Sequence, residues 1–423
     1  MKNFLIKGNL CYSENENTVR LLPGHYLAVE NGLCAGIFAE LPEKYRTLPM
    51  EDFGDKLVIP GMTDLHIHAP QFSFRGLGMD MELLDWLNTY TFPEEAKYAD
   101  LAYADRAYES FAAHLRRSST TRAAVFGTIH VPATELLMEK MERSGLVSYI
   151  GKVNMNRNSP DYLCETSVEA SIDATEQWIC ETKERFANTY PILTPRFIPS
   201  CTDDLMRGLR KLVEKYHLPV QSHLSENFGE IAWVQELCPE SKFYGDAYDR
   251  FGLFGGDHKC IMAHCVHSGE AEVELIKKNG VYIAHSPLSN TNLCSGVAPV
   301  SKYLGEGLNV GLASDVAGGD TENLFRSVAD ALRASKLRWR LLDRNVAPLT
   351  VDQAFYLSTL GGGSFFGKVG SFENGYEFDA VVLDDSELDH PQELTLRARF
   401  ERALYLSDER QIAAKYVRAN RLF

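Results

Sequence analysis

The chain has 423 residues, of which 45% are hydrophobic and 24% charged, a balance typical of a soluble globular enzyme with a large core. Its net charge of −15 disfavours phosphate backbones and anionic lipids, so we expect neither a nucleic-acid partner nor a membrane partner. Nine cysteines without a Cys-x-x-Cys pair indicate reduced thiols rather than disulfides or a thiolate zinc site. No signal peptide or long apolar run is visible, so we expect a cytoplasmic protein.

The two ends of the chain resemble each other in pattern. Residues 1–56 consist of short β-rich pieces with an Asn-Gly turn signal, and the tail again has β-rich runs between glycine-rich turns. We predict that residues 1–56 and 367–423 pair into one small composite β-sandwich domain.

Between these ends, residues 57–366 alternate short β-rich runs with longer helical patterns. Apolar residues in segments such as 100–117 and 167–186 are spaced for one face of a helix. This alternation favours a parallel sheet with crossover helices, and eight units favour a closed (β/α)₈ barrel of the TIM type. The eight runs span residues 56–68, 120–130, 147–155, 191–199, 219–226, 259–266, 281–287 and 310–316.

Polar side chains occur at the C-terminal ends of these runs. In a (β/α)₈ barrel those ends form one mouth, where the active site lies. Eight residues at matching positions, in all but the third run, favour one shared site over scattered polar residues. The residues concerned are His66, His68, His130, Arg196, His223, His264, His285 and Asp315.

Four of these residues form a candidate metal site. His66 and His68 stand two apart on a strand, so both imidazoles can face one ion, and His223 and Asp315 come from other strand ends. Three imidazoles and a carboxylate suit zinc, with iron(II) as the alternative, and leave room for a water. Such an ion makes hydroxide available at neutral pH.

Glu226 follows His223 by three residues, in His-Leu-Ser-Glu. A carboxyl group at this mouth can protonate a substrate ring nitrogen and assist the leaving group. The structural alternative is a first-turn glutamate favoured by the helix dipole.

A binuclear site is the main rival to a single ion. It needs a carboxylated lysine from a middle strand, and Lys152 is the one lysine to consider. Lys152 lies within the third run, however, and the fourth run carries Arg196, which stays protonated. We therefore expect one metal ion per chain.

The chain resembles the amidohydrolase superfamily and, within it, the guanine deaminase family. The superfamily resemblance rests on PGMTDLHIH at 60–68, HLSE at 223–226, MAH ending at His264, and Ser-Asp at 314–315. The narrower resemblance rests on HAPQ at 68–71, LLDWLNTYTFPEE at 83–95, TPRF at 194–197 and SDVAGG at 314–319.

The resemblance implies a role for each matched residue. His66, His68, His223 and Asp315 would bind zinc, and Asp315 would also accept a proton from the metal-bound water. Glu226 would shuttle protons, with His264 hydrogen-bonding the attacking hydroxide or the tetrahedral centre. Gln71 and Arg196 would hold the polar edges of the purine, and Phe197 would flank the ring. His223 and Glu226 would border the same substrate. The resemblance also implies a homodimer.

The predicted reaction is therefore hydrolysis of guanine to xanthine and ammonia by a metal-activated hydroxide, with Glu226 as the proton shuttle. One alternative is a related hydrolase of another N-heterocycle, such as 8-oxoguanine, a nucleoside or a triazine. A second alternative is a barrel that has lost its metal and serves as a non-catalytic scaffold, which the presence of all four ligands and Glu226 disfavours.

Overall fold

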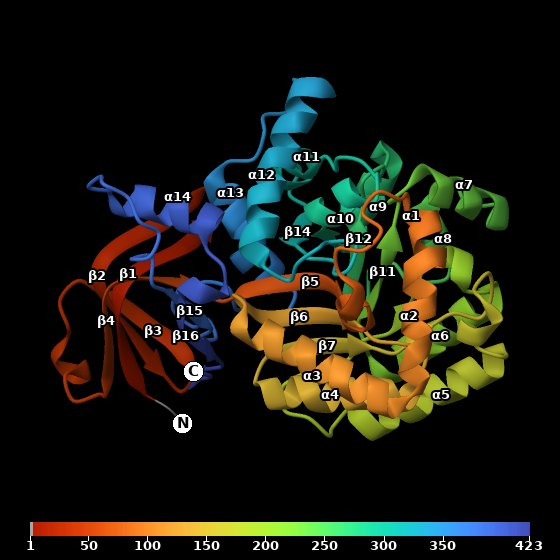
Figure 1. The fold of residues 1–423 in the computed structure, drawn as a ribbon, viewed down its shortest axis with the longest axis horizontal. Coiled ribbons are helices and arrows are strands. Elements are labelled where there is room, and N and C mark those ends of the chain that lie inside the picture. The colour runs from red at the N-terminus through yellow and green to blue at the C-terminus, as the bar shows by residue number, and fades with distance from the viewer. Residues whose placement is uncertain (1–2) are drawn as a thin grey trace.

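A computed structural model describes residues 3–423 of the chain. A β-sheet built from both chain ends lies beside a barrel built from the middle of the chain, as Figure 1 shows. The barrel's strands are surrounded by helices, and the red and blue ends of the chain meet in the neighbouring sheet. This architecture confirms the predicted fold class.

The terminal segments share one seven-stranded sheet, in the order β17-β16-β15-β4-β1-β2-β3. β15 pairs antiparallel with both β16 and β4, so the C-terminal segment lies directly against the N-terminal one. β4 continues to Pro60, so the sheet includes residues on both sides of position 57. Its strands are β1 (Phe4–Asn15), β2 (Thr18–Glu30), β3 (Leu33–Phe38), β4 (Met50–Pro60), β15 (Ala380–Leu383), β16 (Ile412–Val417) and β17 (Asn420–Arg421).

All eight predicted runs contain strands of the barrel. Two parallel four-stranded sheets, β5-β6-β7-β9 and β11-β12-β13-β14, are complemented by the short pair β8-β10. The third and fourth runs are each split in two. The strands are β5 (Met62–His68), β6 (Thr120–Phe126), β7 (Val147–Gly151), β8 (Val153–Asn154), β9 (Thr189–Pro191), β10 (Thr194–Pro195), β11 (Val220–Leu224), β12 (Cys260–His264), β13 (Tyr282–His285) and β14 (Asn309–Leu312).

Two sets of contacts close the barrel. A bridge between Leu193 and Val220 joins the two halves on one side. On the other side, the Asp315 amide donates to the His66 carbonyl at 2.9 Å, and the His68 amide donates to the Val316 carbonyl at 3.0 Å. The first and last strands of the barrel are therefore held together at their C-terminal ends.

Helices connect the strands and cover the barrel. Asp100, Ser167 and Thr202 cap α3, α5 and α6 by accepting backbone N–H bonds in the first turn. The helices are α1 (Leu83–Trp86), α2 (Phe92–Ala96), α3 (Leu101–Arg117), α4 (Val131–Ser144), α5 (Val168–Thr182), α6 (Asp203–Tyr216), α7 (Phe228–Leu237), α8 (Tyr244–Arg250), α9 (Glu270–Asn279), α10 (Pro287–Asn292), α11 (Val300–Gly305), α12 (Leu324–Leu341), α13 (Val351–Tyr356) and α14 (Leu396–Leu406).

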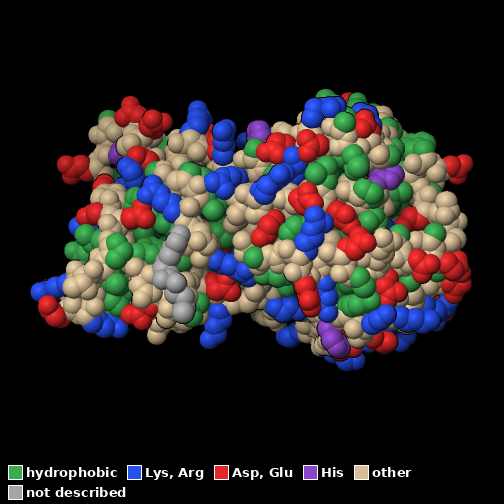
Figure 2. Space-filling model, turned by 90° about the horizontal axis from the view of Figure 1, so that it is seen from below, with side chains coloured by type: hydrophobic (Ala, Val, Ile, Leu, Met, Phe, Trp, Pro, Cys, Tyr) green, Lys and Arg blue, Asp and Glu red, His purple; other side chains and the backbone are tan. Residues whose placement is uncertain are grey.

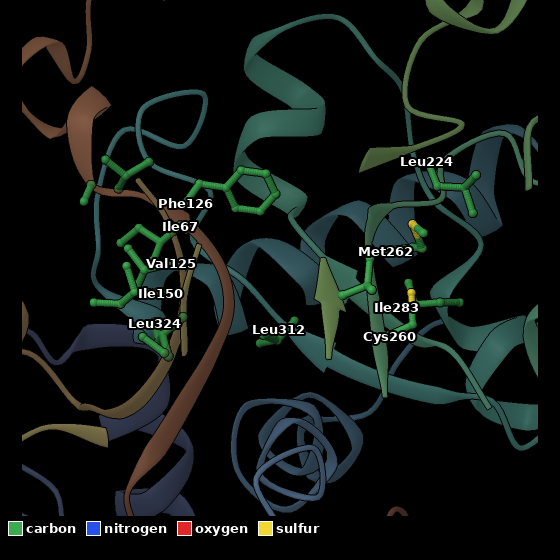
Figure 3. Close-up of a cluster of buried hydrophobic side chains, with 14 of the residues drawn as sticks. Ile67, Val125, Phe126, Ile150, Leu224, Cys260, Met262, Ile283, Leu312 and Leu324 are labelled. Atoms are coloured by element: carbon green, nitrogen blue, oxygen red, sulfur yellow. The ribbon is translucent and has the colours of Figure 1, made fainter. Parts of the chain in front are cut away.

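Apolar side chains fill both faces of the barrel wall. The outward face packs against the helices, and Figure 3 shows part of this layer, including Ile67, Val125, Met262 and Ile283. A smaller cluster contains Leu65 together with residues from strands all around the barrel, so it fills the interior. The barrel is thus a packed core, and its chemistry is confined to one end.

A buried ion pair joins the barrel to the terminal sheet. Arg122 on β6 donates to Asp379 from Nε at 2.8 Å and from Nη2 at 3.1 Å, and both side chains are almost fully buried. Asp379 also accepts the backbone N–H of Arg418 at 2.8 Å. Nearby, the buried Lys415 ammonium donates to three carbonyls at the end of α3.

The surface carries charges of both signs. Figure 2 shows acidic and basic side chains interspersed over the face that it presents. Among residues 3–423, no helix combines the length and the apolar character that crossing a membrane requires.

Replacing Asp379 with alanine should destabilise the protein by about 3–5 kcal/mol, because the buried charge of Arg122 would lose its buried partner and keep only the partly exposed Glu377. Urea unfolding measures this free energy. Asp52→Ala is the control, because the ion pair of Asp52 with Lys7 is solvent-exposed and should contribute no more than about 1 kcal/mol. Equal losses in the two variants would contradict the assignment.

Candidate metal and substrate site

The four predicted ligands meet at the C-terminal mouth of the barrel. His66 Nε2 lies 3.0 Å from Asp315 Oδ1 and 3.2 Å from His68 Nε2. His68 Nε2 lies 3.5 Å from Asp315 Oδ1 and 3.3 Å from His223 Nε2. The structure therefore brings together side chains from β5, from β11 and from the residues after β14.

These separations fit a metal ion. Four ligands at about 2.0–2.1 Å from a tetrahedral zinc stand about 3.3 Å from one another, and the separations given above cluster around this value. The donor set is chemically suitable as well, since imidazole and carboxylate both bind zinc and iron(II). The atoms that could hold a metal come from His66, His68, His223, His264 and Asp315.

Irregular backbone turns these side chains toward the mouth. The pairing of β5 with β6 shifts register between Asp64 and Ile67, and such irregularities re-aim side chains next to active sites. His264 has φ 75° and Asp315 has φ 50°. Backbone in this left-handed region is uncommon for residues other than glycine and is concentrated at functional sites.

Hydrogen bonds to the backbone and to neighbouring side chains orient the imidazoles. His223 Nδ1 lies 2.6 Å from the Arg196 carbonyl, which leaves Nε2 free to face the site. His264 Nδ1 lies 2.9 Å from Asn290 Oδ1. Its Nε2 is 3.4 Å from Glu226 Oε2 and 3.7 Å from Asp315 Oδ2, so His264 stands between the two carboxylates.

Glu226 is buried beside this cluster and held by a hydroxyl group. The Ser295 hydroxyl donates to Glu226 Oε1 at 3.0 Å. Burial, with the nearby carboxylates Glu230 and Asp315, raises the pKa of Glu226 to about 7, although His264 and Ser295 act in the opposite direction. A carboxyl group with such a pKa can both accept and donate a proton near neutral pH.

The pKa of Asp315 is lowered, in contrast to that of Glu226. Burial alone would raise its pKa, but the adjacent imidazoles of His66 and His264 and the hydrogen bond to His66 outweigh it, so the pKa falls to about 2. The site thus contains one carboxylate that is ionised at neutral pH before the reaction and one carboxyl group whose pKa lies near neutral pH.

Gln71 and Arg196 form a polar part of the site, and both donate hydrogen bonds to the same carboxylate, Glu95. Arg196 donates to Glu95 from Nη1 at 2.6 Å and from Nη2 at 3.1 Å. Gln71 Nε2 donates to Glu95 Oε1 at 2.9 Å, and Gln71 Oε1 accepts the Ala317 N–H at 3.1 Å. Glu95 and Arg196 are both buried.

These groups line a cavity at the mouth of the barrel. Leu83, Trp86 and Leu87, from the segment that runs from α1 toward α2, cover it from one side. All the predicted site residues except His66 line the cavity, together with several apolar residues. The lining comprises His68, Gln71, Leu83, Trp86, Leu87, Arg196, Phe197, His223, Glu226, Glu230, His264, Leu293, Asp315 and Gly318.

Two other histidines at strand ends lie outside this cavity lining. His285, the last residue of β13, is buried, and neither of its ring nitrogens has a hydrogen-bond partner within residues 3–423. His130 precedes α4 and is half-buried. Lys152, the residue considered for a second metal, is buried and forms an ion pair with Glu165.

Four residues of the site were missed by the sequence analysis: Glu95, Glu230, Asn290 and Ser295. Glu95 ends the quoted segment LLDWLNTYTFPEE, but nothing local to it indicates Arg196 as its partner. Asn290 and Ser295 follow β13. Asn290 contacts His264 at the end of β12, and Ser295 contacts Glu226, which follows β11. Glu230 accepts from the backbone N–H of Glu226 and from the Tyr244 hydroxyl.

Comparison with known proteins agrees with this geometry. The profile of the amidohydrolase family matches residues 57–411. A solved structure of guanine deaminase from C. acetobutylicum, with guanine bound in its active site, is 47% identical with a TM-score of 0.97, and the match covers 100% of both chains. Guanine deaminase of Dictyostelium discoideum is 35% identical over 99% of this chain and 98% of its own. That of Escherichia coli is also 35% identical, over 88% and 84% respectively.

The chain therefore belongs to the amidohydrolase family of hydrolases. Within this family it is a relative of the guanine deaminases, which it matches over most or all of their length.

Proposed function

We infer that this chain is a guanine deaminase, which hydrolyses guanine to xanthine and ammonia. The observation that carries the inference is the layout of one cavity. A cluster of metal-ligand type and Glu226 lie at one part of its wall, and the hydrogen-bonding side chains Gln71 and Arg196 lie at another. The guanine-bound relative supports this choice of substrate.

We propose that His66, His68, His223 and Asp315 hold one zinc ion, with iron(II) as the alternative. When bound, such an ion supplies Lewis acidity and makes water a nucleophile at neutral pH. The convergence of their donor atoms supports this ligand set. Because Lys152 is engaged by Glu165, no second metal is part of the proposal.

Glu226 moves the protons of the reaction. Water adds to C2 of guanine, the ring carbon that carries the amino group, and the C2–N bond then breaks. Asp315 accepts a proton from the attacking water, and its low pKa keeps it ionised beforehand. Glu226 donates a proton to the ring nitrogen beside C2, then takes the proton of the new C2 hydroxyl group and passes it to the departing amine, so that C2 becomes a carbonyl and ammonia leaves. A pKa of about 7 suits these transfers, and the proton held by Asp315 returns to Glu226 at the end of the cycle.

The other residues bind and orient. His264, held by Asn290, is placed to hydrogen-bond the tetrahedral carbon's new oxygen. Gln71 and Arg196 bind polar edges of the purine, and Phe197 flanks the ring. The apolar cover formed by Leu83, Trp86 and Leu87 excludes water.

Purified, metal-replete protein should release ammonia from guanine much faster than from 8-oxoguanine, adenine or guanosine. An ammonia assay at equal substrate concentrations checks this. A robust release from one of the other substrates, with none from guanine, would show that the cavity serves a different N-heterocycle. No release from any of them, nor from triazines, would favour the non-catalytic scaffold.

Glu226→Gln should retain the metal but lower kcat by about 10²–10⁴-fold, because an amide cannot transfer the proton. Stopped assays of xanthine formation, together with metal analysis of the same sample, measure both properties. The control is Glu236→Gln on the exposed side of α7, which should leave kcat unchanged. Near-normal turnover in Glu226→Gln would remove Glu226 as the proton shuttle.

Elemental analysis should find about one zinc or iron ion per chain, and His68→Ala should lose it while remaining folded. His130→Ala serves as the matched control, since His130 also follows a barrel strand but lies apart from the ligand cluster. Two ions per chain would contradict the proposal and implicate Lys152. The homodimer and the cytoplasmic location stay predictions, and light scattering tests the first.

A further inference from the structure

We propose that Glu95 is a positioning residue that sets substrate selectivity: it fixes Gln71 and Arg196 as hydrogen-bond donors toward the purine's carbonyl-bearing edge. This inference rests on the proposed deamination of guanine. Glu95 lies on α2 and is 1% exposed. It is not part of the cavity lining identified within residues 3–423, so it acts through the two side chains that it contacts.

The carboxylate of Glu95 accepts three N–H bonds from the cavity wall. Oε2 accepts from Arg196 Nη1 at 2.6 Å, and Oε1 accepts from Arg196 Nη2 at 3.1 Å and from Gln71 Nε2 at 2.9 Å. A paired guanidinium and carboxylate of this kind has a fixed relative orientation. Glu95 therefore determines where both donors stand.

The amide of Gln71 is fixed from both of its ends. Its oxygen accepts the Ala317 N–H at 3.1 Å, and its nitrogen donates one hydrogen to Glu95. If the amide turned over, its oxygen would face Glu95 and its NH₂ group would face another N–H. Because both contacts would then be repulsive, Gln71 keeps its second N–H available for the cavity that it lines.

Arg196 needs Glu95 for a different reason. Arg196 is 3% exposed, and a guanidinium buried without a counter-charge is strongly unfavourable. Glu95 compensates this charge and occupies only part of the five N–H donors of the guanidinium. The Phe92 ring, whose centroid lies 5.3 Å from the Arg196 carbon Cζ, further restricts the side chain.

The resulting wall offers N–H donors and selects a ligand with acceptors. The carbonyl oxygen of guanine supplies such an acceptor, whereas 2-aminopurine has the same C2 amino group but no C6 carbonyl. A site built to hydrogen-bond a substrate group discriminates against an analogue that lacks it, because buried donors are then left unpaired. Selectivity for guanine should therefore depend on the charge and acceptors of Glu95.

The test compares the two ligands in Glu95→Gln. A glutamine has one acceptor oxygen and its own NH₂ group, so it cannot accept all three N–H bonds, and Gln71 or Arg196 must turn away. We expect KM for guanine to rise at least 10-fold with kcat changed less than threefold. The inhibition constant of 2-aminopurine against guanine deamination should change less than threefold. Metal content should stay at the wild-type level.

Two further variants complete the experiment. Glu94→Gln is the matched control, because Glu94 lies on the same helix and is also buried, but bonds Lys97 and the Tyr103 hydroxyl instead of the cavity wall. It should leave both constants unchanged. Glu95→Asp keeps the charge and should retain an intermediate selectivity, because the shorter side chain reaches fewer of the donors.

The outcomes separate the inference from the proposed function. If KM for guanine and the 2-aminopurine constant rise together, or if neither changes, Glu95 has no role in selectivity and the inference is wrong. If Glu95→Gln does not fold, Glu95→Asp decides by the ratio of the 2-aminopurine inhibition constant to KM for guanine. A fall of this ratio by threefold or more supports the inference, and an unchanged ratio overturns it. A wild-type protein inactive on guanine would instead contradict the proposed function.

Discussion

The site depends on the hydrogen bonds that close the barrel between its first and last strands. The Asp315 amide donates to the His66 carbonyl, and the His68 amide donates to the carbonyl of Val316. The same backbone atoms that complete the barrel thus belong to residues of the proposed ligand set. Asp64 strengthens the closure by accepting the Ser314 amide at 3.1 Å and the Ser314 hydroxyl at 2.5 Å.

Because of this closure, metal-ligating residues that are far apart in the sequence are brought together by the barrel itself and not by a flexible loop. Side chains on rigid strands are held more accurately than side chains on loops. The left-handed backbone at Asp315 costs free energy, and the closing hydrogen bonds hold it in place. The geometry of the site is therefore a consequence of the barrel's completion.

Burial of charge imposes a second constraint on the molecule. A charged group removed from water must be paired with a partner of opposite sign or lose its charge. Arg196 is paired with Glu95 inside the mouth, and Arg122 is paired with Asp379 at the junction with the terminal sheet. In both places, the partner comes from a segment remote in sequence, so the pairing also fixes how that segment packs.

The sequence allowed the barrel and the ligand cluster to be predicted because both leave periodic signals. Each strand is a short apolar run, and the residue that follows the run must lie at the mouth. The eight runs, and the meeting of His66, His68, His223 and Asp315, follow from this rule. The rule fails for His285, which also ends a strand and was therefore expected at the mouth, but which lies outside the cavity lining.

What the sequence could not show are partners set by tertiary packing. Glu95 and Arg196 are 101 positions apart, and Glu226 and Ser295 are 69 positions apart. Neither pair shares a periodicity or a motif spacing, so neither contact can be read from the sequence. Such contacts arise only when the segment from α1 to α2 and the residues after β13 fold onto the mouth.

The charges around the cavity narrow the range of substrates. Glu226, Glu230 and Asp315 all line it, and Arg196, the one arginine of the lining in the described part of the chain, is already neutralised by Glu95. Among the lining side chains contributed by residues 3–423, a phosphate group would meet three carboxylates and no unpaired lysine or arginine, so these side chains disfavour nucleotides. The apolar cover from Leu83, Trp86 and Leu87 leaves little to hydrogen-bond a ribose. Both properties suit a flat, uncharged base, which is the form in which guanine would enter.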